Sequence, residues 1–423
     1  MNIHIFSRPI VLVAVVAAFA LTDVRNAISE DWPRLLGPNQ NSQSSETNLL
    51  LNWPETGPPV LWRKALGTGF SPPVIANNHV LVFHRKGDNA ILDALDAVTG
   101  KPKWSYTYET HYKDSYGFNG GPRSAPTISG NRVYAIGADG LLSCLTLDKG
   151  TLIWKRQVLE DFRVPQNFFG VGVSPVIEGD LLLLNVGATN GAGIVAFDTA
   201  TGETRWQATG EEASYSTPVT ATINGKHLAF FLARGGLVVL ETETGQIIDD
   251  YSFRARKHES VNAASPLVIE DTVLISSSYR VGSALLRVGA EGLEDVWVDK
   301  VSMQSHWATC LQSGDVLYGC TGRHENEAAL RCLSLADGSL LWEAPRGLGR
   351  STYIMAAGHL IGVGERGDLV LIEANPERYI EKARVRLFAH PAWAPPSLAN
   401  GLLYVRDETQ IVCMDLRKRN AHE

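Results

Sequence analysis

Short apolar runs separated by polar turns recur along most of the chain in a fixed order. A Ser or Thr stands before a Pro, an apolar run follows, and a polar turn leads to a second apolar run. Clear copies occupy residues 71–83, 124–136, 173–186, 216–231 and 264–277, with weaker relatives at 309–320, 353–363 and 394–405. Runs of this length, rich in β-branched residues and lacking helical periodicity, predict β-strands throughout.

A turn glycine followed by a tryptophan recurs with the same period as these pairs of apolar runs. Residues 94–104 read ALDAVTGKPKW and residues 196–206 read AFDTATGETRW, and weaker copies follow, one with Asp249 in place of the Trp. Successive glycines lie 43 to 52 residues apart, a period typical of repeat architectures. The residues expected to dock one repeat on the next are Asp96, Gly100, Trp104, Gly150, Trp154, Asp198, Gly202, Trp206, Trp297, Gly338 and Trp342.

Each repeat therefore reads as four strands, with the glycine in the last hairpin turn. Four antiparallel strands at this spacing describe a propeller blade. Glycine permits the positive φ of such a turn, and the indole supplies a flat surface between neighbouring blades. The predicted fold is all-β, a single eight-bladed β-propeller.

Closure of the ring gives a sharper expectation. The eighth repeat ends after three strands, whereas an unassigned segment around Trp62 precedes the first repeat. We predict that Val60 to Ala65 is the missing outer strand of the last blade, which removes the exposed sheet edges. Residues 57–423 then form the propeller and residues 28–56 an N-terminal arm outside the regular count.

The first residues differ from the rest. Ile10 to Leu21 is an apolar run too short to span a bilayer, and Ala18-Phe19-Ala20 offers a cleavage site. Residues 1–27 are predicted to be a signal peptide and short linker, with a buried N-terminal helix as the alternative. The mature protein would then be exported, periplasmic or extracellular, without a membrane span.

Composition and charge narrow the kinds of partner and site that are expected. The formal net charge is −7 and no basic stripe is present, so a nucleic-acid partner is not expected. Three of the five cysteines, at positions 144, 332 and 413, fall where other repeats have a buried Ala. Cys310 and Cys320 are expected on neighbouring strands, which leaves a disulfide open. With His324 they match no standard zinc spacing, and no metal site is predicted.

Standard catalytic motifs are absent, so no catalytic residue is assigned. The segments that enter each blade and the loops after each second strand should gather at one mouth of the channel. The residues that we expect there are Arg85, Arg123, Asn190, Tyr215, Arg234, Asn262, Tyr279, Arg280, His306, Arg323, His324, Arg350, Arg366 and Trp393. Arginines suit anionic groups, and aromatics with amides suit sugars. The competing interpretation is that these loops are polar without binding anything.

The docking motif at 94–104 and 196–206 resembles that of pyrroloquinoline quinone (PQQ)-like propellers, which include BamB-like assembly factors and quinoprotein alcohol dehydrogenases. The whole of 57–423 is similar to exported members of planctomycete type. The resemblance implies either a binding role or PQQ chemistry. Family enzymes carry two adjacent cysteines and a calcium site of acidic and amide side chains, and no Cys-Cys pair occurs here.

We therefore expect an exported, monomeric, non-catalytic binding or scaffold module. It would hold an envelope protein or a small anionic or sugar ligand at its loop face. The alternative is a PQQ-dependent dehydrogenase of alcohols or sugars, with PQQ as its candidate cofactor. A third interpretation is a structural protein that docks through the arm at 28–56.

Overall fold

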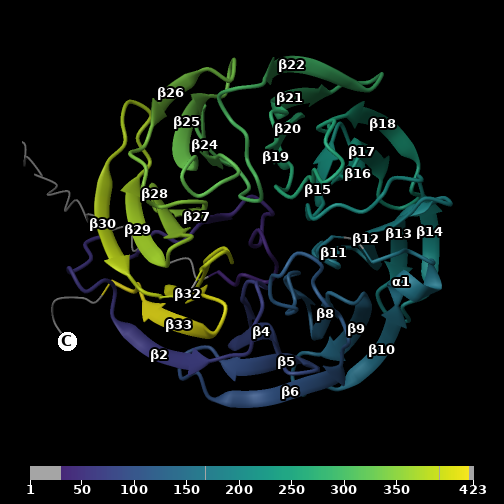
Figure 1. The fold of residues 1–423 in the computed structure, drawn as a ribbon, viewed down its shortest axis with the longest axis horizontal. Helices are drawn as coiled ribbons and strands as arrows, with labels where there is room; N and C mark the ends of the chain where they lie inside the picture. The colour runs from purple at the N-terminus through teal and green to yellow at the C-terminus, as the bar shows by residue number, and fades with distance from the viewer. Residues whose placement is uncertain (1–29, 167, 390, 419–423) are drawn as a thin grey trace, which may run out of the picture.

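A computed structural model describes residues 30–166, 168–389 and 391–418, so the predicted signal peptide lies outside the described residues. Eight sheets surround a central axis as the blades of a propeller (Figure 1), which confirms the predicted fold. The single short helix in the described ranges is α1 (Val158–Asp161). None of the helices described there is long and apolar enough to cross a membrane.

Every blade is a four-stranded antiparallel sheet. The innermost strands are β3 (Val74–Ala76), β7 (Thr127–Ser129), β11 (Val176–Glu178), β15 (Val219–Ile223), β19 (Leu267–Ile269), β23 (Leu311–Ser313), β27 (Ser351–Ala356) and β31 (Ser397–Ala399). The second strands are β4 (His79–Lys86), β8 (Arg132–Ile136), β12 (Leu181–Ala188), β16 (Lys226–Leu232), β20 (Thr272–Ser277), β24 (Val316–Thr321), β28 (His359–Gly364) and β32 (Leu402–Arg406). The third strands are β5 (Asn89–Asp96), β9 (Leu141–Thr146), β13 (Ala192–Asp198), β17 (Gly236–Glu241), β21 (Gly282–Val288), β25 (Ala329–Ser334), β29 (Asp368–Glu373) and β33 (Gln410–Asp415). The outer strands are β6 (Pro102–Glu109), β10 (Leu152–Gln157), β14 (Thr204–Ala208), β18 (Ile247–Ser252), β22 (Leu293–Asp299), β26 (Leu340–Glu343), β30 (Glu381–Arg386) and β2 (Val60–Ala65).

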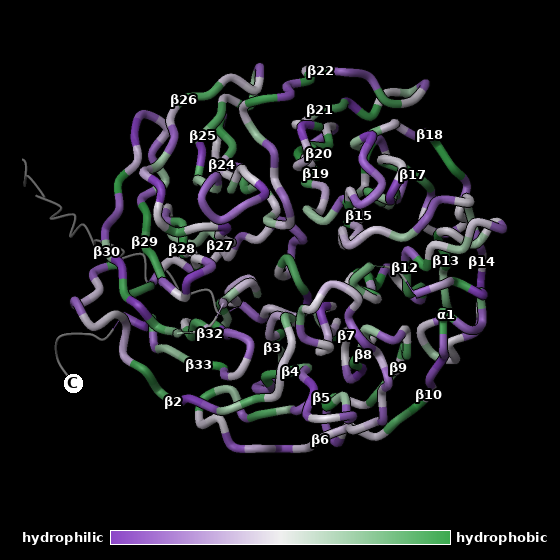
Figure 2. Tube along the Cα trace, in the orientation of Figure 1, coloured by the Kyte–Doolittle hydropathy of each residue, from purple (hydrophilic) through white to green (hydrophobic). Residues whose placement is uncertain are grey.

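Burial follows the position of a strand within its blade. Middle strands such as β12 and β13 are buried almost throughout, because neighbouring blades cover both of their faces. Outer strands such as β6 alternate between exposed and half-buried residues. Figure 2 shows hydrophobic residues within the blades, and hydrophobic and polar residues mixed along the outer rim.

The two ends of the chain close the ring in the last blade. Strand β2 pairs antiparallel with β33, so that Trp62 lies opposite Cys413. The outer strand of this blade thus comes from the start of the propeller and its other three strands from the end. This confirms the predicted closure by Val60 to Ala65.

Arg406 strengthens the same seam from inside. Its side chain is fully buried at the end of β32, and its guanidinium donates to the carbonyl oxygens of Gly69, Ser71, Phe83 and Asp407 at 2.9–3.0 Å. Burial lowers the pKa of Arg406 to about 10, which still leaves it charged at neutral pH. A buried cation with its N–H groups satisfied therefore joins blade 8 to the first blade.

An indole and a bare glycine meet where one blade contacts the next. The ring of Trp62 covers Gly100, and a Cβ placed on that glycine would lie 2.6 Å from Trp62 Cδ2. Trp104, Trp154, Trp206 and Trp297 cover the corresponding glycines 150, 202, 245 and 338. Each of these indoles, and that of Trp342, also donates its Nε1–H to a backbone carbonyl of the following blade at 2.7–3.1 Å.

Blade 4 achieves its contact differently. Asp249 occupies the tryptophan position, and its carboxylate accepts a hydrogen bond from the Leu293 amide of blade 5 at 2.7 Å. Gly292 faces this carboxylate instead of an indole. A charged hydrogen bond thus replaces one ring contact, which explains why the sequence departs from the pattern here.

The arm lies against the propeller and reaches every blade. Its hydrogen bonds involve Ile75, Ile128, Thr220, Gln312, Met355 and Gly401, which belong to blades 1, 2, 4, 6, 7 and 8. Arg34 lies beside blade 3 near Glu178, and Leu36 joins an apolar cluster from blades 4 and 5. Strand β1 (Gln43–Ser44) adds in parallel to β27. Figure 1 shows this segment, in purple, crossing the centre of the ring.

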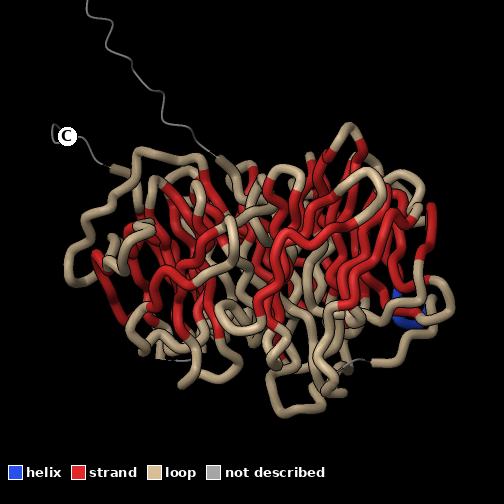
Figure 3. The backbone as a smooth tube through the Cα atoms, turned by 90° about the horizontal axis from the view of Figure 1, so that it is seen from above, coloured by secondary structure: helices blue, strands red, loops and turns tan. Residues whose placement is uncertain are grey.

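The arm therefore marks one end of the central channel. It contacts the turns that link first to second strands, for example through the Asn77 amide, which donates to Asp31 at 3.1 Å. The longer connections between blades lie on the opposite side, below the strands in Figure 3. Trp32, fully buried beside blade 1, secures this placement. The channel is crossed by the arm at one end, and the predicted mouth lies at the other.

Because the indole lies directly on the glycine, replacing that glycine by a residue with a side chain is expected to lower the stability of the fold. Gly100 has φ +67°, and Gly87 has φ +59° with nothing within 4 Å of its would-be Cβ. Alanine at either position should cost about 1–2 kcal/mol for the left-handed backbone. We expect Gly100→Ala to cost about 1–3 kcal/mol more than Gly87→Ala, because only it displaces an indole. Guanidinium unfolding of both variants measures the difference, and equal losses would contradict the contact.

The buried carboxyl of Glu46, in the arm, leads to a prediction of how folding stability depends on pH. Burial raises the pKa of this carboxyl from 4.5 to about 7, although Glu46 Oε2 accepts the Gly401 amide at 2.6 Å. The folded state then binds more protons than the unfolded chain between these values, so stability falls as the pH rises from 4.5 to about 7. Glu46→Gln retains an acceptor without ionising. Its unfolding midpoint should rise relative to that of the natural protein across this window, whereas parallel pH profiles would refute the prediction.

Candidate functional site

A pocket opens at the channel mouth opposite the arm, and all eight entering segments supply residues to it. Its volume is about 240 Å³, and Leu35 of the arm lies among the lining residues. One representative from each entering segment, in chain order, is Phe70, Arg123, Phe169, Tyr215, Val261, Trp307, Arg350 and Trp393. The repeat geometry therefore brings these positions, distant in sequence, around one hollow.

Six of the sixteen lining residues are Phe, Tyr or Trp, and their rings cluster in the wall. Trp393 stacks on Phe70 with ring centroids 4.8 Å apart and lies 5.7 Å from Trp307. Across the pocket, Phe169 lies 5.4 Å from Tyr215, whose hydroxyl accepts the Phe169 amide at 2.8 Å. Burial raises the pKa of Tyr215 well above its usual range, so its hydroxyl stays neutral. The wall is rigid, aromatic and mostly apolar.

Arg350 belongs to this wall and is already paired. Its guanidinium binds both carboxylate oxygens of Glu365 and lies 4.7 and 5.2 Å from the ring centroids of Trp307 and Trp393. Trp393 Nε1 also donates to Glu365, at 3.0 Å. Burial would raise the pKa of Glu365, but the hydrogen bonds and charge of Arg350 hold it below its ordinary value. The positive charge of Arg350 is thus balanced inside the wall.

Arg123 is satisfied in the same way. Its guanidinium donates to Asp114 at 2.6 Å and to the carbonyls of Asn119 and Gly121, and it lies 5.7 Å from the ring centroid of Phe70. The Asp114 side chain is 1% exposed, so the pair is shielded from solvent. Neither pocket arginine is therefore an open anion receptor.

His306 and Trp307 present polar atoms that lack a protein partner within the described ranges. These are His306 Nδ1 and Trp307 Nε1, both buried. The other nitrogen, His306 Nε2, lies 3.3 Å from the Tyr279 hydroxyl. Burial, followed by the nearby charges of Arg350 and Arg323, lowers the pKa of His306 to about 3, so the ring is neutral at physiological pH. Both residues line the pocket, but these two atoms are themselves closed to solvent.

The structure brings together five of the predicted mouth residues, namely Arg123, Tyr215, His306, Arg350 and Trp393. Tyr279, Arg323 and His324 lie behind His306, where Arg323 stacks 4.5 Å from the Tyr279 centroid. Asn190 and Arg234 line a separate groove.

The remaining predicted residues do not line the pocket, and they make hydrogen bonds or ion pairs within and between the loops. Arg85 donates to four backbone carbonyls, and Asn262 is buried with its amide bound to Ala233 and Phe253. Arg366 pairs with Glu325, and the Arg280 amide donates to Gln304. Five of the seven predicted arginines thus have a carboxylate partner, so the rim is not a free cluster of positive charge.

Sequence reasoning missed the apolar part of the site. Phe70, Phe118, Phe169 and Trp307 line the pocket but were not among the expected residues. A signal was present, because each lies within six residues before the Ser or Thr that opens a blade. Attention to charged and amide residues concealed this aromatic series.

None of the five cysteines lines the pocket. All five cysteines are buried and free, so Cys310 and Cys320 carry no disulfide here. Burial raises the pKa of Cys310 to about 11, which disfavours the thiolate. Among the described residues, no three His, Cys, Asp or Glu side chains gather closely enough to hold a metal ion.

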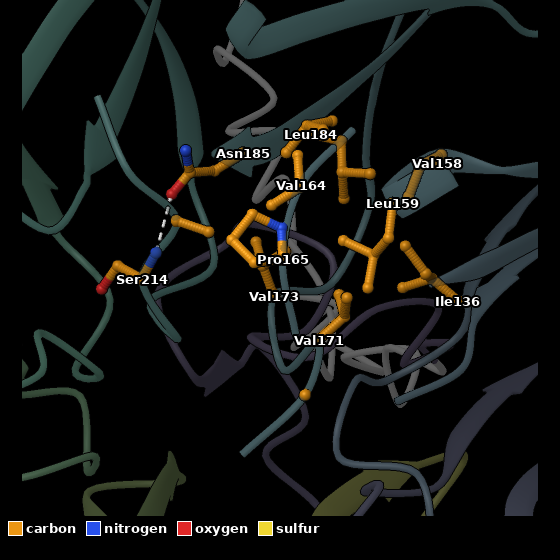
Figure 4. Close-up of a pocket in the computed structure, with 13 residues that line it drawn as sticks. Ile136, Val158, Leu159, Val164, Pro165, Val171, Val173, Leu184, Asn185 and Ser214 are labelled. Atoms are coloured by element: carbon orange, nitrogen blue, oxygen red, sulfur yellow. Dashed lines mark hydrogen bonds between the residues drawn. The ribbon is translucent and has the colours of Figure 1, made fainter. Parts of the chain in front are cut away.

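A small closed-in cavity between blades 2 and 3 cannot hold a ligand. Figure 4 shows apolar side chains that line it, such as Val164 and Leu184, and Val158 and Leu159 of α1 also belong to the lining. Its volume is about 20 Å³, and Asn185 Oδ1 accepts the Ser214 amide at 3.0 Å. This space suits at most a single water molecule.

Comparisons with known proteins agree with this geometry. The family model described as outer membrane protein assembly factor BamB matches residues 42–161 and 111–344. BamB from Moraxella catarrhalis superposes with a TM-score of 0.61 at 14% identity, covering 86% of this chain and 99% of that one. Quinohemoprotein alcohol dehydrogenase from Comamonas testosteroni gives 0.67 at 12% identity, covering 94% and 82%. No curated protein sequence matches the chain. At such identities these structures share the fold, which does not choose between assembly and oxidation.

The paired arginine of the wall predicts a coupled response to substitution. Arg350→Met leaves the Glu365 carboxylate, whose side chain is 8% exposed, without its partner. We expect a loss of about 1–3 kcal/mol of stability. The double variant Arg350→Met/Glu365→Gln should recover most of it, since no unpaired charge remains. Chemical unfolding measures this cycle, and additive losses would show that the pair is not coupled.

Proposed function

The chain belongs to the PQQ-like propeller family whose model is described as outer membrane protein assembly factor BamB, and on that basis we propose that it is an exported, non-catalytic binding module. Its site is the aromatic pocket at the channel mouth. One observation carries the proposal. The channel is crossed by the arm at one end, and at the other it opens into a hollow to which every blade contributes.

The lining defines what the pocket accepts. Aromatic side chains form the largest group in the lining, and the charges of Arg123 and Arg350 are balanced by Asp114 and Glu365. An anion would find no unpaired charge in the wall, whereas an apolar or aromatic group would gain by leaving water. A volume of about 240 Å³ accommodates one or two large side chains. We therefore infer a partner protein of the cell envelope that inserts such side chains.

The arm supports this assignment to the mouth. Trp32, Leu36 and Leu49 are buried against the propeller, and Glu46 binds blade 8. A segment committed to its own ring has little apolar surface left for a partner. Docking through the arm is therefore the weaker interpretation, and deleting the arm would expose core surface instead of testing it.

The dehydrogenase alternative draws on the likeness to the Comamonas enzyme. Family enzymes use adjacent cysteines and a calcium site of acidic and amide side chains. The aromatic wall suits a planar ring, but the chain has no Cys-Cys pair and gathers no acidic set in its described part. These residues do not fit the PQQ–calcium group. The alternative predicts dye reduction after incubation with PQQ and calcium across a panel of alcohols and sugars, and such activity would replace the binding proposal.

Peptide selection tests the pocket directly. A random peptide library displayed on phage is selected on the full chain and counter-selected on Trp393→Ala. We expect the selected peptides to share an aromatic or large aliphatic residue and to bind Trp393→Ala and Trp307→Ala at least about tenfold more weakly, as buried aromatic anchors do.

Trp53→Ala is the matched control. This half-buried indole lies on the arm side and donates to Leu50 at 2.9 Å, so its loss should leave peptide affinity unchanged. The proposal fails if no peptide is enriched, or if the selected peptides bind the pocket variants as tightly as the natural protein.

A further inference from the structure

A second concavity, the lateral groove, lies beside the pocket on the same side of the propeller. Its volume is about 550 Å³, and it is formed by residues 162–166, 187–190 and 212–213 together with Phe168, Arg234 and His258. Phe168 lines the groove while its neighbour Phe169 lines the pocket. The two hollows are therefore adjacent but built from different residues. A volume of this size is in the range of sites for small ligands.

Arg234 fixes the two banks of the groove relative to each other. It is 8% exposed, and its guanidinium donates to the Glu212 carboxylate at 2.9 Å and to the His258 carbonyl at 3.0 Å. It also lies 5.3 Å from the ring centroid of Phe168. The Ser260 hydroxyl donates to the carbonyls of Ala255 and Lys257 and so shapes the bank at 254–260. The groove is a built feature with braced walls.

Positive charge is concentrated around this groove, although the chain is acidic overall. His258 lines one bank and ends the run Arg254-Ala255-Arg256-Lys257-His258, whose basic side chains are exposed, and the other bank presents the exposed Arg163. None of these basic side chains forms an ion pair within the described part of the chain, unlike the arginines of the pocket. The acidic residues beside the lining segments in the sequence are Glu160, Asp161, Glu211, Glu212 and Glu259. Asp161 is paired with Arg156 and Glu212 with Arg234, and Glu211 accepts the Gly235 amide. The groove can therefore attract an anion.

Neutral polar groups lie between the basic residues. Thr189 and Asn190 are exposed at the tip of the loop between β12 and β13, and Gln166 lies on the facing bank. Hydroxyl and amide groups beside a partly exposed ring, here Phe168, suit the hydroxyls and the C–H face of a sugar ring. A simple anion would make no contact with these hydroxyl and amide groups. A neutral sugar would make no charged contact with the basic side chains.

We propose that the lateral groove binds acidic oligosaccharides, that is, chains of uronic acid residues. Arg163 and Lys257 attract the carboxylates from opposite banks, while Asn190 and Thr189 bind ring hydroxyls. This site is independent of the proposed function, because no pocket-lining residue takes part. The protein would then hold a partner at its mouth and an anionic polysaccharide beside it.

Calorimetric titration of the full chain with tetragalacturonate tests the proposal. Maltotetraose serves as the neutral probe and tetraglutamate as the acidic peptide probe. We expect tetragalacturonate to bind more tightly than either, and its affinity to fall severalfold when salt is raised from about 50 to about 300 mM. Arg163→Gln/Lys257→Gln should weaken binding at least about tenfold.

Lys101→Gln/Lys149→Gln is the matched control, since it removes two exposed charges from turns on the arm side. It should leave the affinity unchanged, as should Trp393→Ala in the pocket, whereas Asn190→Ala should weaken tetragalacturonate alone. Circular dichroism verifies that each variant is folded. The proposal is overturned if tetragalacturonate does not bind, if maltotetraose binds equally well, if tetraglutamate binds equally and competes, or if the groove variant binds normally.

Discussion

The contact between an indole and the bare α-carbon of a turn glycine holds this ring together. The glycine must have a positive φ for the turn and must lack a side chain for the indole, and both requirements meet at Gly100. The ring of Trp62 completes this contact at the seam, where β2 also pairs with β33. Three carbonyl hydrogen bonds from Arg406, to Gly69, Ser71 and Phe83, reinforce the same junction. Because all eight blades are held in a closed circle, the segments that enter them converge on one mouth.

Convergence of loops then decides the chemistry of the mouth. Each entering segment places a side chain at the channel, and most of these are aromatic. The arginines of the same loops form ion pairs with nearby carboxylates, as Arg350 does with Glu365. Their role is to orient the aromatic wall, since the guanidinium of Arg350 lies against Trp307 and Trp393. Unpaired positive charge is found instead at the lateral groove, where Arg163 and Lys257 make no ion pair within the described residues. Under the two proposals made above, apolar recognition and anion recognition are separated on one face.

Much of the fold could be predicted from the sequence, because each blade repeats the same local rules. Strand pattern, turn glycine and Trp62 were enough to predict the number of blades and the closure by Val60 to Ala65. The site was less accessible. Whether Arg123 is open or paired depends on Asp114, nine residues earlier in a loop without a repeat pattern. The path of the arm was also beyond prediction, because Trp32 finds its place only against blades formed later in the chain. The fold class and the ring closure predicted from the repeat were confirmed, whereas predictions that needed side-chain pairing across loops required coordinates.

Amide hydrogen exchange on the full chain tests ring closure most directly. If β2 is the outer strand of the last blade, peptides covering residues 58–66 and 408–416 are both strongly protected and lose protection together as denaturant is added, since they belong to one sheet. Rapid exchange of 58–66 while 408–416 stays protected would show that the two ends of the chain do not pair, and would contradict the closed ring on which the mouth and both binding sites depend.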